Sequence, residues 1–176
     1  KAKNPDVVFF GGEYPQAAMM FRQAREKGIK SRFMGPDGLD AAELLKLGGD
    51  AVVGLSFVTV AGSVREYPRA REFTEEFKKK FGKDPEIFAA QAYDAAAIGL
   101  RGVEAAIKEA GGKAPTREAV ATAVRRVKHN GITGSVEFDE RGDLKKATYL
   151  IYEVARDWKD NKLVKRFELA PPARKP

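Results

Sequence analysis

Asp6-Val-Val-Phe-Phe10, followed by the pair Gly11-Gly12, is the stretch that decides the fold class of this chain. A short apolar run that ends at glycines predicts a buried β-strand followed by a turn. Apolar residues then recur at helical spacing between Tyr14 and Lys27, and Gly28 is a natural stop. The beginning of the chain therefore predicts a strand followed by a helix.

The same alternation continues further along the chain. Arg32-Phe-Met34 predicts a second strand, and Gly35-Pro-Asp-Gly38 predicts a turn. We expect Asp40 to cap a short helix, because Glu43 follows three residues later in a capping-box arrangement. Alternating strands and helices predict an α/β fold with a parallel sheet flanked by helices. In such folds the ligand crevice lies at the carboxyl ends of the strands.

The middle of the chain has a different pattern. Val52 to Val60 is rich in β-forming residues and is longer than one short strand needs, so it can continue out of the first sheet as a connection. Three predicted helices then follow in succession: Tyr67 to Phe81, Glu86 to Ala110, and Thr116 to Lys128 with Thr116 as cap. No strand lies nearby in the sequence, so we expect the sheet that these helices cover to be built from residues outside this stretch.

Strand character returns towards the end of the chain. The predicted strands are Ser135 to Phe138, Ala147 to Val154 and Leu163 to Phe167, with Asp160-Asn161 as a hairpin turn. The proline-rich segment Pro171 to Pro176 is expected to be a flexible tail.

Composition narrows the range of functions. The net charge of +7 could favour nucleic acid, but the basic residues are dispersed. Lys78-Lys79-Lys80 lies between Phe77 and Phe81 and is expected to be the solvated face of an amphipathic helix. No nucleic-acid-binding motif accompanies the charge, so we expect no nucleic-acid partner.

The usual catalytic and metal-binding side chains are scarce. The chain has no cysteine and one histidine, His129, which excludes disulfides, thiol catalysis and two-histidine metal sites. Gly11-Gly12 lacks a nucleotide-binding pattern around it, and Asp139, Glu140 and Asp143 lack the spacing of a calcium loop and favour a surface turn. We expect no enzyme, no cofactor and no metal site.

No apolar run approaches the roughly 20 residues that span a bilayer. No signal peptide is visible at Lys1, so we expect that any secretion signal was cleaved or lies upstream.

Two longer motifs carry a family resemblance. They are Phe77-Lys-Lys-Lys-Phe-Gly-Lys-Asp-Pro-Glu-Ile-Phe-Ala-Ala-Gln-Ala-Tyr-Asp-Ala95 and Gly131-Ile-Thr-Gly-Ser-Val-Glu-Phe-Asp-Glu-Arg-Gly-Asp143. Their order and spacing resemble the solute-binding proteins of branched-chain amino acid ABC importers, the Leu/Ile/Val-binding group of type I periplasmic binding proteins. The resemblance implies two parallel-sheet lobes flanked by helices, of which this chain would be an incomplete, C-terminal portion.

The resemblance also implies a division of the chain. Residues 1–58 and 135–170 would belong to the ligand-binding second lobe, and residues 62–130 would be the helical part of the first lobe. Two hinges would lie near Val58-Thr59-Val60 and Thr133-Gly134-Ser135. Thr59 and Gly134 are accordingly the predicted hinge residues.

The resemblance places four residues at the ligand. Asp37 occupies the position of the acidic residue that pairs with the α-ammonium of the amino acid, although without the resemblance it reads as a turn residue. Gly12, Glu13 and Tyr14 occupy the loop after the first strand, where many members carry a tyrosine directly after the two glycines. Two interpretations stay open: Glu13 is a second carboxylate that favours a polar or basic ligand, or it faces solvent while Tyr14 packs over the ligand.

The implied function is capture of an amino acid, branched-chain by resemblance, between two lobes and its delivery to an ABC importer permease. The implied location is periplasmic or extracytoplasmic. The alternative is a receptor of the same fold that senses an amide, a carboxylate or a polar amino acid. We also expect an N-terminal half of the same protein, or a second copy, to cover the apolar faces of the predicted helices.

Overall fold

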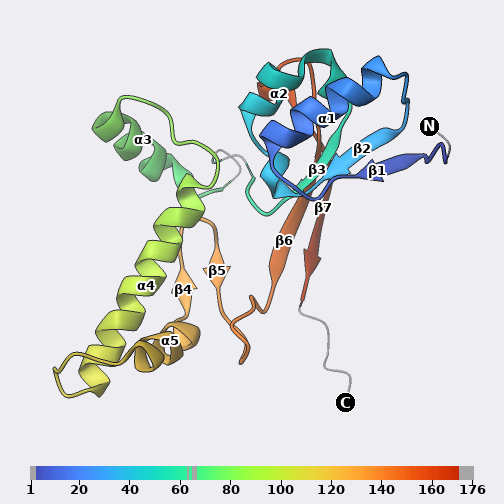
Figure 1. Cartoon of the computed structure of the whole chain (residues 1–176). Helices are drawn as coiled ribbons and strands as arrows, with labels where there is room; N and C mark the ends of the chain where they lie inside the picture. The colour runs from blue at the N-terminus through green and yellow to red at the C-terminus, as the bar shows by residue number, and fades with distance from the viewer. Residues whose placement is uncertain (1–2, 63, 65–66, 171–176) are drawn as a thin grey trace. The chain divides into compact units, whose positions relative to one another are not determined.

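The computed structural model describes residues 3–62, 64 and 67–170 (Figure 1). The predicted tail, residues 171–176, lies outside the described residues. The chain divides into two compact units. Unit 1 consists of Lys1–Val60 and Thr148–Phe167, and unit 2 of Ala61–Ala147 and Glu168–Pro176.

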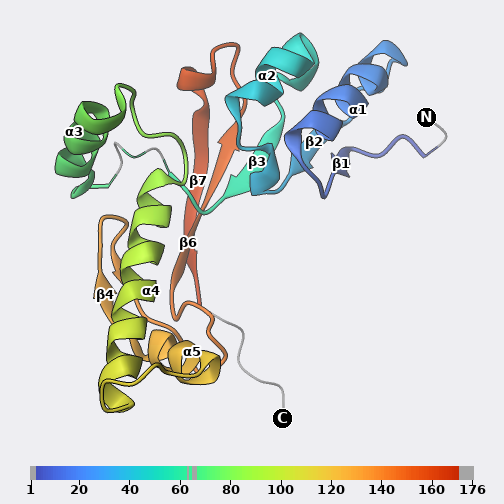
Figure 2. The same ribbon diagram turned by 60° about the vertical axis from the view of Figure 1, so that its left-hand side comes forward.

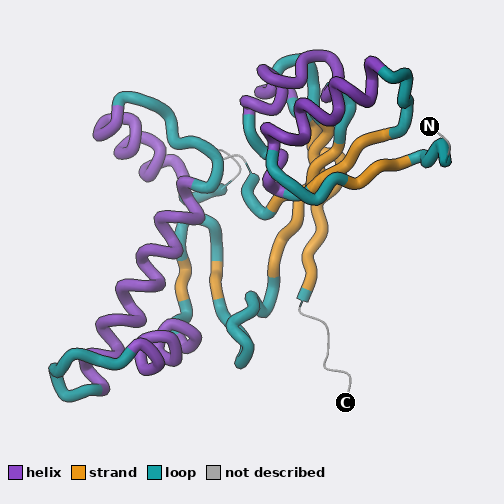
Figure 3. Tube along the Cα trace, in the orientation of Figure 1, coloured by secondary structure: helices purple, strands orange, loops and turns teal. Residues whose placement is uncertain are grey.

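Unit 1 contains a sheet with the strand order β1-β2-β3-β6-β7 (Figure 3). Its strands are β1 (Val7–Phe9), β2 (Arg32–Gly35), β3 (Ser56–Thr59), β6 (Ala147–Glu153) and β7 (Lys162–Leu169). β1, β2 and β3 are parallel neighbours, with Val8 opposite Phe33 and Met34 opposite Ser56, whereas β6 is antiparallel to β3. The predicted α/β fold with parallel strands is thus confirmed.

The helices of unit 1 are α1 (Tyr14–Glu26) and α2 (Ala42–Gly48), which lie beside one another on the sheet (Figures 1 and 2). Short 3-10 turns lie between the larger elements: η1 (Asp37–Leu39), η2 (Gly49–Val52) and η4 (Trp158–Asp160). The predicted turn residues Asp160 and Asn161 lie at the end of a longer connection from β6 to β7, which also contains η4 and in which the Asn161 side chain accepts a hydrogen bond from Ala155 N–H.

The core of unit 1 is aromatic. Phe21 of α1 stacks on Phe33 of β2 with ring centroids 4.2 Å apart, and Phe57 of β3 stacks on Tyr152 and Trp158. Burial of each such ring stabilises the fold by roughly 1.5–3 kcal/mol. Val7 and Phe9 alternate with Val8 along β1 and are 51% and 61% exposed. The face of β1 opposite this core is therefore open in the described residues.

Unit 2 is mainly helical. It contains α3 (Ala70–Phe81), α4 (Ala89–Glu109), α5 (Arg117–Arg126) and a two-stranded sheet of β4 (His129–Asn130) and β5 (Ser135–Val136). The three predicted helices are confirmed, and so is the cap at Thr116, whose hydroxyl accepts a hydrogen bond from Ala119 N–H at 3.2 Å. The strand predicted over Ser135 to Phe138 is shorter, because its ladder ends at Val136 and Phe138 makes only an isolated bridge to Leu144.

The long helix α4 has one buried stripe and one open face. Its buried residues recur at every fourth position and pack against the rest of unit 2: Ala90, Asp94, Ile98, Gly102 and Ala106. Large apolar side chains elsewhere on the helix are exposed, including Tyr93 at 58% and Leu100 at 71%. Within the described residues, no helix is long and apolar enough to cross a membrane.

Candidate functional site

Two loops meet at the carboxyl ends of β1 and β2. Phe10 N–H donates to Met34 O at 2.8 Å, which continues the pairing of the two strands beyond Phe9. A Cβ atom on Gly38 would lie 2.8 Å from the Gly12 carbonyl oxygen and 2.9 Å from Glu13 Oε2. Because a side chain at position 38 would clash, Gly38 allows the Glu13 loop to approach the Asp37 turn closely. The family resemblance implied both loops for the site, and the structure places them side by side.

The four predicted ligand residues have different surroundings. Asp37 is the first residue of η1 and is exposed, as is Glu13, which precedes α1 without making a side-chain cap. Gly12 is half-buried with Phe10 ring atoms beneath it. Tyr14 is half-buried at the start of α1 and packs against the aromatic core. The arrangement presents two carboxylates at one edge of the sheet, which is chemically suited to a cationic group.

Asp40 is a site feature that the sequence did not reveal. The predicted helix cap is wrong: α2 begins at Ala42 with Ala41 as its N-cap, and no side-chain cap bond is made. Asp40 is instead turned inward, 6% exposed, and its carboxyl group is hydrogen-bonded to Thr59. Burial raises the pKa of Asp40 to about 7; the Thr59 hydrogen bond acts against this rise, and the negative charge of Asp37 adds to it. Glu43, the expected partner in a capping box, instead forms an ion pair with Lys46.

The predicted hinge residues lie in separate units. Thr59 ends β3, is 1% exposed, and immediately precedes Val60, where the first segment of unit 1 ends. Gly134 lies in unit 2 with φ +119°, and its carbonyl oxygen accepts a hydrogen bond from Gly131 N–H at 2.9 Å. This bond closes the tight loop between β4 and β5, and a positive φ of this kind favours glycine. The role of these two residues as hinges remains a prediction.

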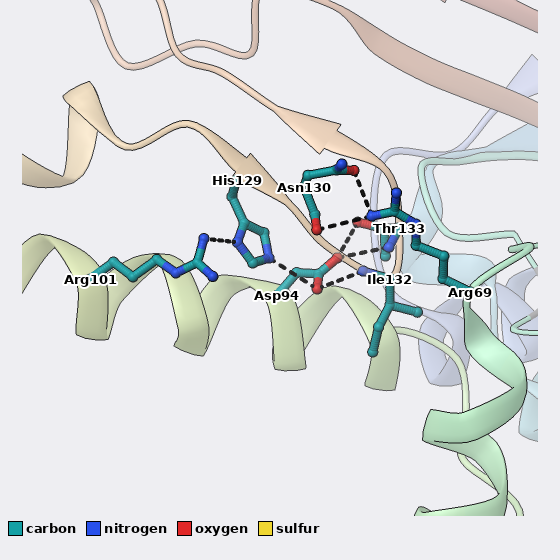
Figure 4. A network of polar contacts seen from close by, with 7 residues as sticks. All are labelled: Arg69, Asp94, Arg101, His129, Asn130, Ile132 and Thr133. Atoms are coloured by element: carbon teal, nitrogen blue, oxygen red, sulfur yellow. Dashed lines mark hydrogen bonds and ion pairs between the residues drawn. The ribbon is translucent and has the colours of Figure 1, made fainter.

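A buried polar network anchors that loop to α4 (Figure 4). Asp94 accepts hydrogen bonds from Ile132 N–H at 3.0 Å, Thr133 N–H at 2.8 Å and the Thr133 hydroxyl at 2.6 Å. Burial alone would raise the pKa of Asp94, but the hydrogen bonds from Thr133, Ile132 and His129 lower it overall. The Asp94 carboxylate therefore stays ionised and holds the loop before Gly134 in place.

The same network fixes the proton on His129. Arg101 Nη1 lies 3.0 Å from His129 Nδ1 and can only donate, so Nδ1 is an acceptor. The ring proton is then on Nε2, 3.3 Å from Asp94 Oδ1. A Cβ atom on Gly131 would overlap both Asp94 Oδ1 and His129 Nε2. Sequence reasoning did not find this network, although one signal was available: Asp94 is the lone acid on the buried i, i+4 stripe of α4.

Metal binding finds no support among the described residues. No group of three or more His, Cys, Asp or Glu side chains there could hold a metal ion. Asp139 uses its carboxylate to accept hydrogen bonds from Arg141 N–H and Asp143 N–H, so it stabilises its own turn.

Comparison with known proteins places this geometry in a family. The sequence pattern of the family described as periplasmic binding protein matches residues 1–160. A leucine-, isoleucine-, valine-, threonine- and alanine-binding protein of Pseudomonas aeruginosa is 36% identical over 158 residues, which is 89% of this chain and 40% of the relative. A leucine-specific-binding protein of Salmonella typhimurium is 30% identical over 156 residues, or 86% of this chain and 39% of the relative. This chain therefore spans well under half the length of these relatives.

Comparison with solved structures supports the same family. The crystal structure of a leucine-binding protein LivK from Thermotoga maritima has a TM-score of 0.76 at 32% identity, covering 97% of this chain and 46% of that one. The branched-chain amino acid transporter substrate-binding protein LivJ of Streptococcus pneumoniae has a TM-score of 0.66 at 22% identity, covering 94% and 45%, and shows the shared fold alone. The chain therefore belongs to the periplasmic binding protein family and has the type I fold of its branched-chain amino acid-binding members.

Proposed function

We propose that this chain is part of a solute-binding protein that captures an amino acid, branched-chain in the first instance, and delivers it to an ABC importer outside the cytoplasm. The observation that carries the proposal is the contact between the Glu13 loop and the Asp37 turn at the carboxyl edge of the sheet. The names of the relatives support the same ligand class. Family members are binding proteins, so no reaction is proposed for the site.

Asp37 has the central role in this proposal. Its carboxylate is exposed at the start of η1, where it is accessible to the α-ammonium of a ligand. An ammonium taken out of water needs an anionic partner, since leaving a buried charge unpaired costs several kcal/mol. Tyr14 would pack beside the ligand, and closure of the two lobes would take place about Thr59 and Gly134.

Calorimetry with a panel of amino acids tests the proposal on the full chain as its gene encodes it. We expect binding of leucine, isoleucine or valine, and a loss of at least about 100-fold in affinity for Asp37→Ala, because a charged hydrogen-bonding partner is removed. Glu140→Ala is the matched control, since this carboxylate is also exposed but lies in unit 2. If no amino acid binds, the proposed ligand class is wrong.

A second candidate is a receptor of the same fold for a polar or basic ligand. It is favoured by the position of Glu13 Oε2 against Gly38, which adds a second negative charge beside Asp37. Lysine and arginine in the same panel separate the two candidates. Tighter binding of these than of leucine, lost in Glu13→Gln, would favour the second.

We further propose that strands from outside this chain cover its open apolar faces. Val7 and Phe9 on β1 and Tyr93 and Leu100 on α4 are more than half exposed, and apolar surface of this extent favours association. The relatives' greater length supports a source within the same protein. Light scattering of this chain at rising concentration is expected to show self-association, and co-expression with the remaining part of the protein is expected to suppress it. A monomer at all concentrations would contradict this.

A further inference from the structure

Asp40 is a buried carboxyl group with an unmatched oxygen. It is 6% exposed, and Oδ2 is the one buried side-chain polar atom without a hydrogen-bond partner in the part of the chain that the structure describes. Buried polar atoms are nearly always paired, because an unpaired one costs free energy of desolvation. An exception beside the proposed ligand turn calls for a functional reason.

The position of Asp40 links two parts of unit 1. Its backbone N–H donates to Asp37 O at 2.9 Å and closes the turn η1 that carries Asp37. Its carboxyl group is hydrogen-bonded to Thr59, the last residue of β3 before the boundary of unit 1. The carboxyl group is therefore coupled to the proposed ligand-binding turn and to the end of β3.

The charges around Asp40 have one sign. Asp37 of η1 acts on it as a negative charge, and Glu13 lies against Gly38 of the same turn. β3 contributes Thr59 and contains no titratable side chain, while Glu43 at the start of α2 is exposed and paired with Lys46. Within the described residues, no basic side chain is among the groups that shift the pKa of Asp40. A cation arriving at Asp37 would offset the negative charge that acts on this carboxyl group.

Building on the proposed function, we propose that Asp40 is a proton-linked residue of the ligand site, which releases its proton when a cationic nitrogen of the ligand pairs with Asp37. The O–H bond of the carboxylic acid breaks, the carboxylate remains hydrogen-bonded to Thr59, and the proton passes to the buffer. The nitrogen cancels the repulsion from Asp37 and attracts the ionised form of Asp40. By linkage, protonation of Asp40 weakens ligand binding by the same factor.

The direction of the pH effect follows. The pKa of Asp40 is about 7 in the ligand-free protein, so the carboxyl group is largely protonated at pH 6 and largely ionised at pH 8. A ligand that lowers this pKa by about one unit would bind up to about tenfold more tightly at pH 8 than at pH 5.5. Affinity that falls as the pH rises would have the wrong sign.

Calorimetry in phosphate and in Tris measures the proton directly, since the two buffers have different ionisation enthalpies. The probe is L-leucine, or the tightest amino acid of the panel, at pH 7 with the full chain as its gene encodes it. We expect release of up to roughly half a proton per ligand bound, because the group is about half protonated at this pH. The deaminated analogue 4-methylpentanoate lacks the cationic nitrogen and is expected to release none.

Asp40→Asn is the diagnostic variant, and Glu43→Gln is its control. Asn keeps the size and the Thr59 contact but cannot ionise, so proton release and the pH dependence of Kd are expected to disappear, with Kd at every pH close to the low-pH value of the unmodified protein, in which Asp40 is protonated. Glu43 is an exposed carboxylate of the same segment and is ionised in both states, so its variant is expected to release protons as the unmodified protein does. Carbon-13 titration of the Asp40 carboxyl group in the unmodified protein provides a test that does not depend on the folding of the variant.

The outcomes are distinguishable. Proton release that vanishes in Asp40→Asn supports the inference. Amino acid binding without proton release, release that persists in Asp40→Asn, or a carboxyl group that titrates below pH 5 without ligand overturns it and leaves the proposed function standing. Failure of every amino acid to bind overturns both.

Discussion

Asp94 on α4 accepts hydrogen bonds from both the backbone N–H and the hydroxyl of Thr133, 39 residues further along the chain, at 2.8 and 2.6 Å. A carboxylate with several donors is stabilised in its ionised form even when it is 3% exposed. This pair fixes the loop that contains Gly134 to the long helix of unit 2, and it makes Asp94 the polar anchor of that unit.

Removal of this anchor is expected to destabilise the protein. Asp94→Ala leaves the N–H groups of Ile132 and Thr133 without their acceptor, at a cost of about 2–4 kcal/mol in the free energy of unfolding. Urea denaturation measures the change. Asp84→Ala removes only a surface ion pair with Lys78, in which Asp84 is 62% exposed, and is expected to cost less than about 1 kcal/mol. Equal effects of the two substitutions would contradict the anchoring role.

Two glycines of α4 are expected to respond in opposite directions to alanine. A Cβ atom on Gly102 would overlap Val124 Cγ2 of α5 and approach its backbone N at 3.1 Å, so Gly102→Ala should separate the two helices and cost about 1–3 kcal/mol. A Cβ atom on Gly99 meets nothing within 4 Å, so Gly99→Ala should stabilise this chain by about 0.5–1 kcal/mol through helix propensity. Thermal unfolding of both variants decides the signs.

The buried aspartates of the two units are expected to give opposite pH dependences. The pKa of Asp40 is raised from 3.8 to about 7, so the folded state binds the proton more tightly, and stability from this group is lost as the pH rises between these values. Asp40→Asn should therefore gain stability relative to the unmodified protein between pH 5 and 8, by up to about 4 kcal/mol.

The contribution of Asp94 to stability changes with pH in the opposite direction. Its pKa is lowered from 3.8, so its contribution is present above that value and is lost as the pH falls. Urea denaturation of Asp40→Asn and Asp94→Ala at several pH values measures how the free energy of unfolding of each variant depends on pH. A flat pH dependence for Asp40→Asn relative to the unmodified protein would show that the carboxyl group is ionised throughout.

The tautomer of His129 is a further expected observable. Because Arg101 donates to Nδ1, nitrogen-15 NMR should show an unprotonated Nδ1 and a protonated Nε2 directed at Asp94. Arg101→Ala removes the donor and is expected to make the two tautomers more equal. A proton on Nδ1 in the unmodified protein would exclude the Arg101 contact.

The order of elements could be predicted without the structure, because hydrophobic periodicity and terminal glycines are local signals. The run Val7 to Phe10, the helix that follows it and the cap at Thr116 could all be predicted in this way. Asp37 and Glu13 were proposed for the site from the family resemblance, since a carboxylate in a turn carries no local sign of a ligand.

The roles of Asp40 and Asp94, in contrast, depend on how the chain packs in three dimensions. The spacing of Asp40 and Glu43 matches a helix cap, but the inward position beside Thr59 depends on how η1 packs on β3. Asp94 and Thr133 are far apart in sequence, and their contact exists only once β4 and β5 lie along α4 (Figure 4). Local sequence patterns indicate backbone conformation, whereas burial and long-range hydrogen bonds are set by packing. Burial and hydrogen bonding then decide which carboxyl groups are ionised and which are protonated.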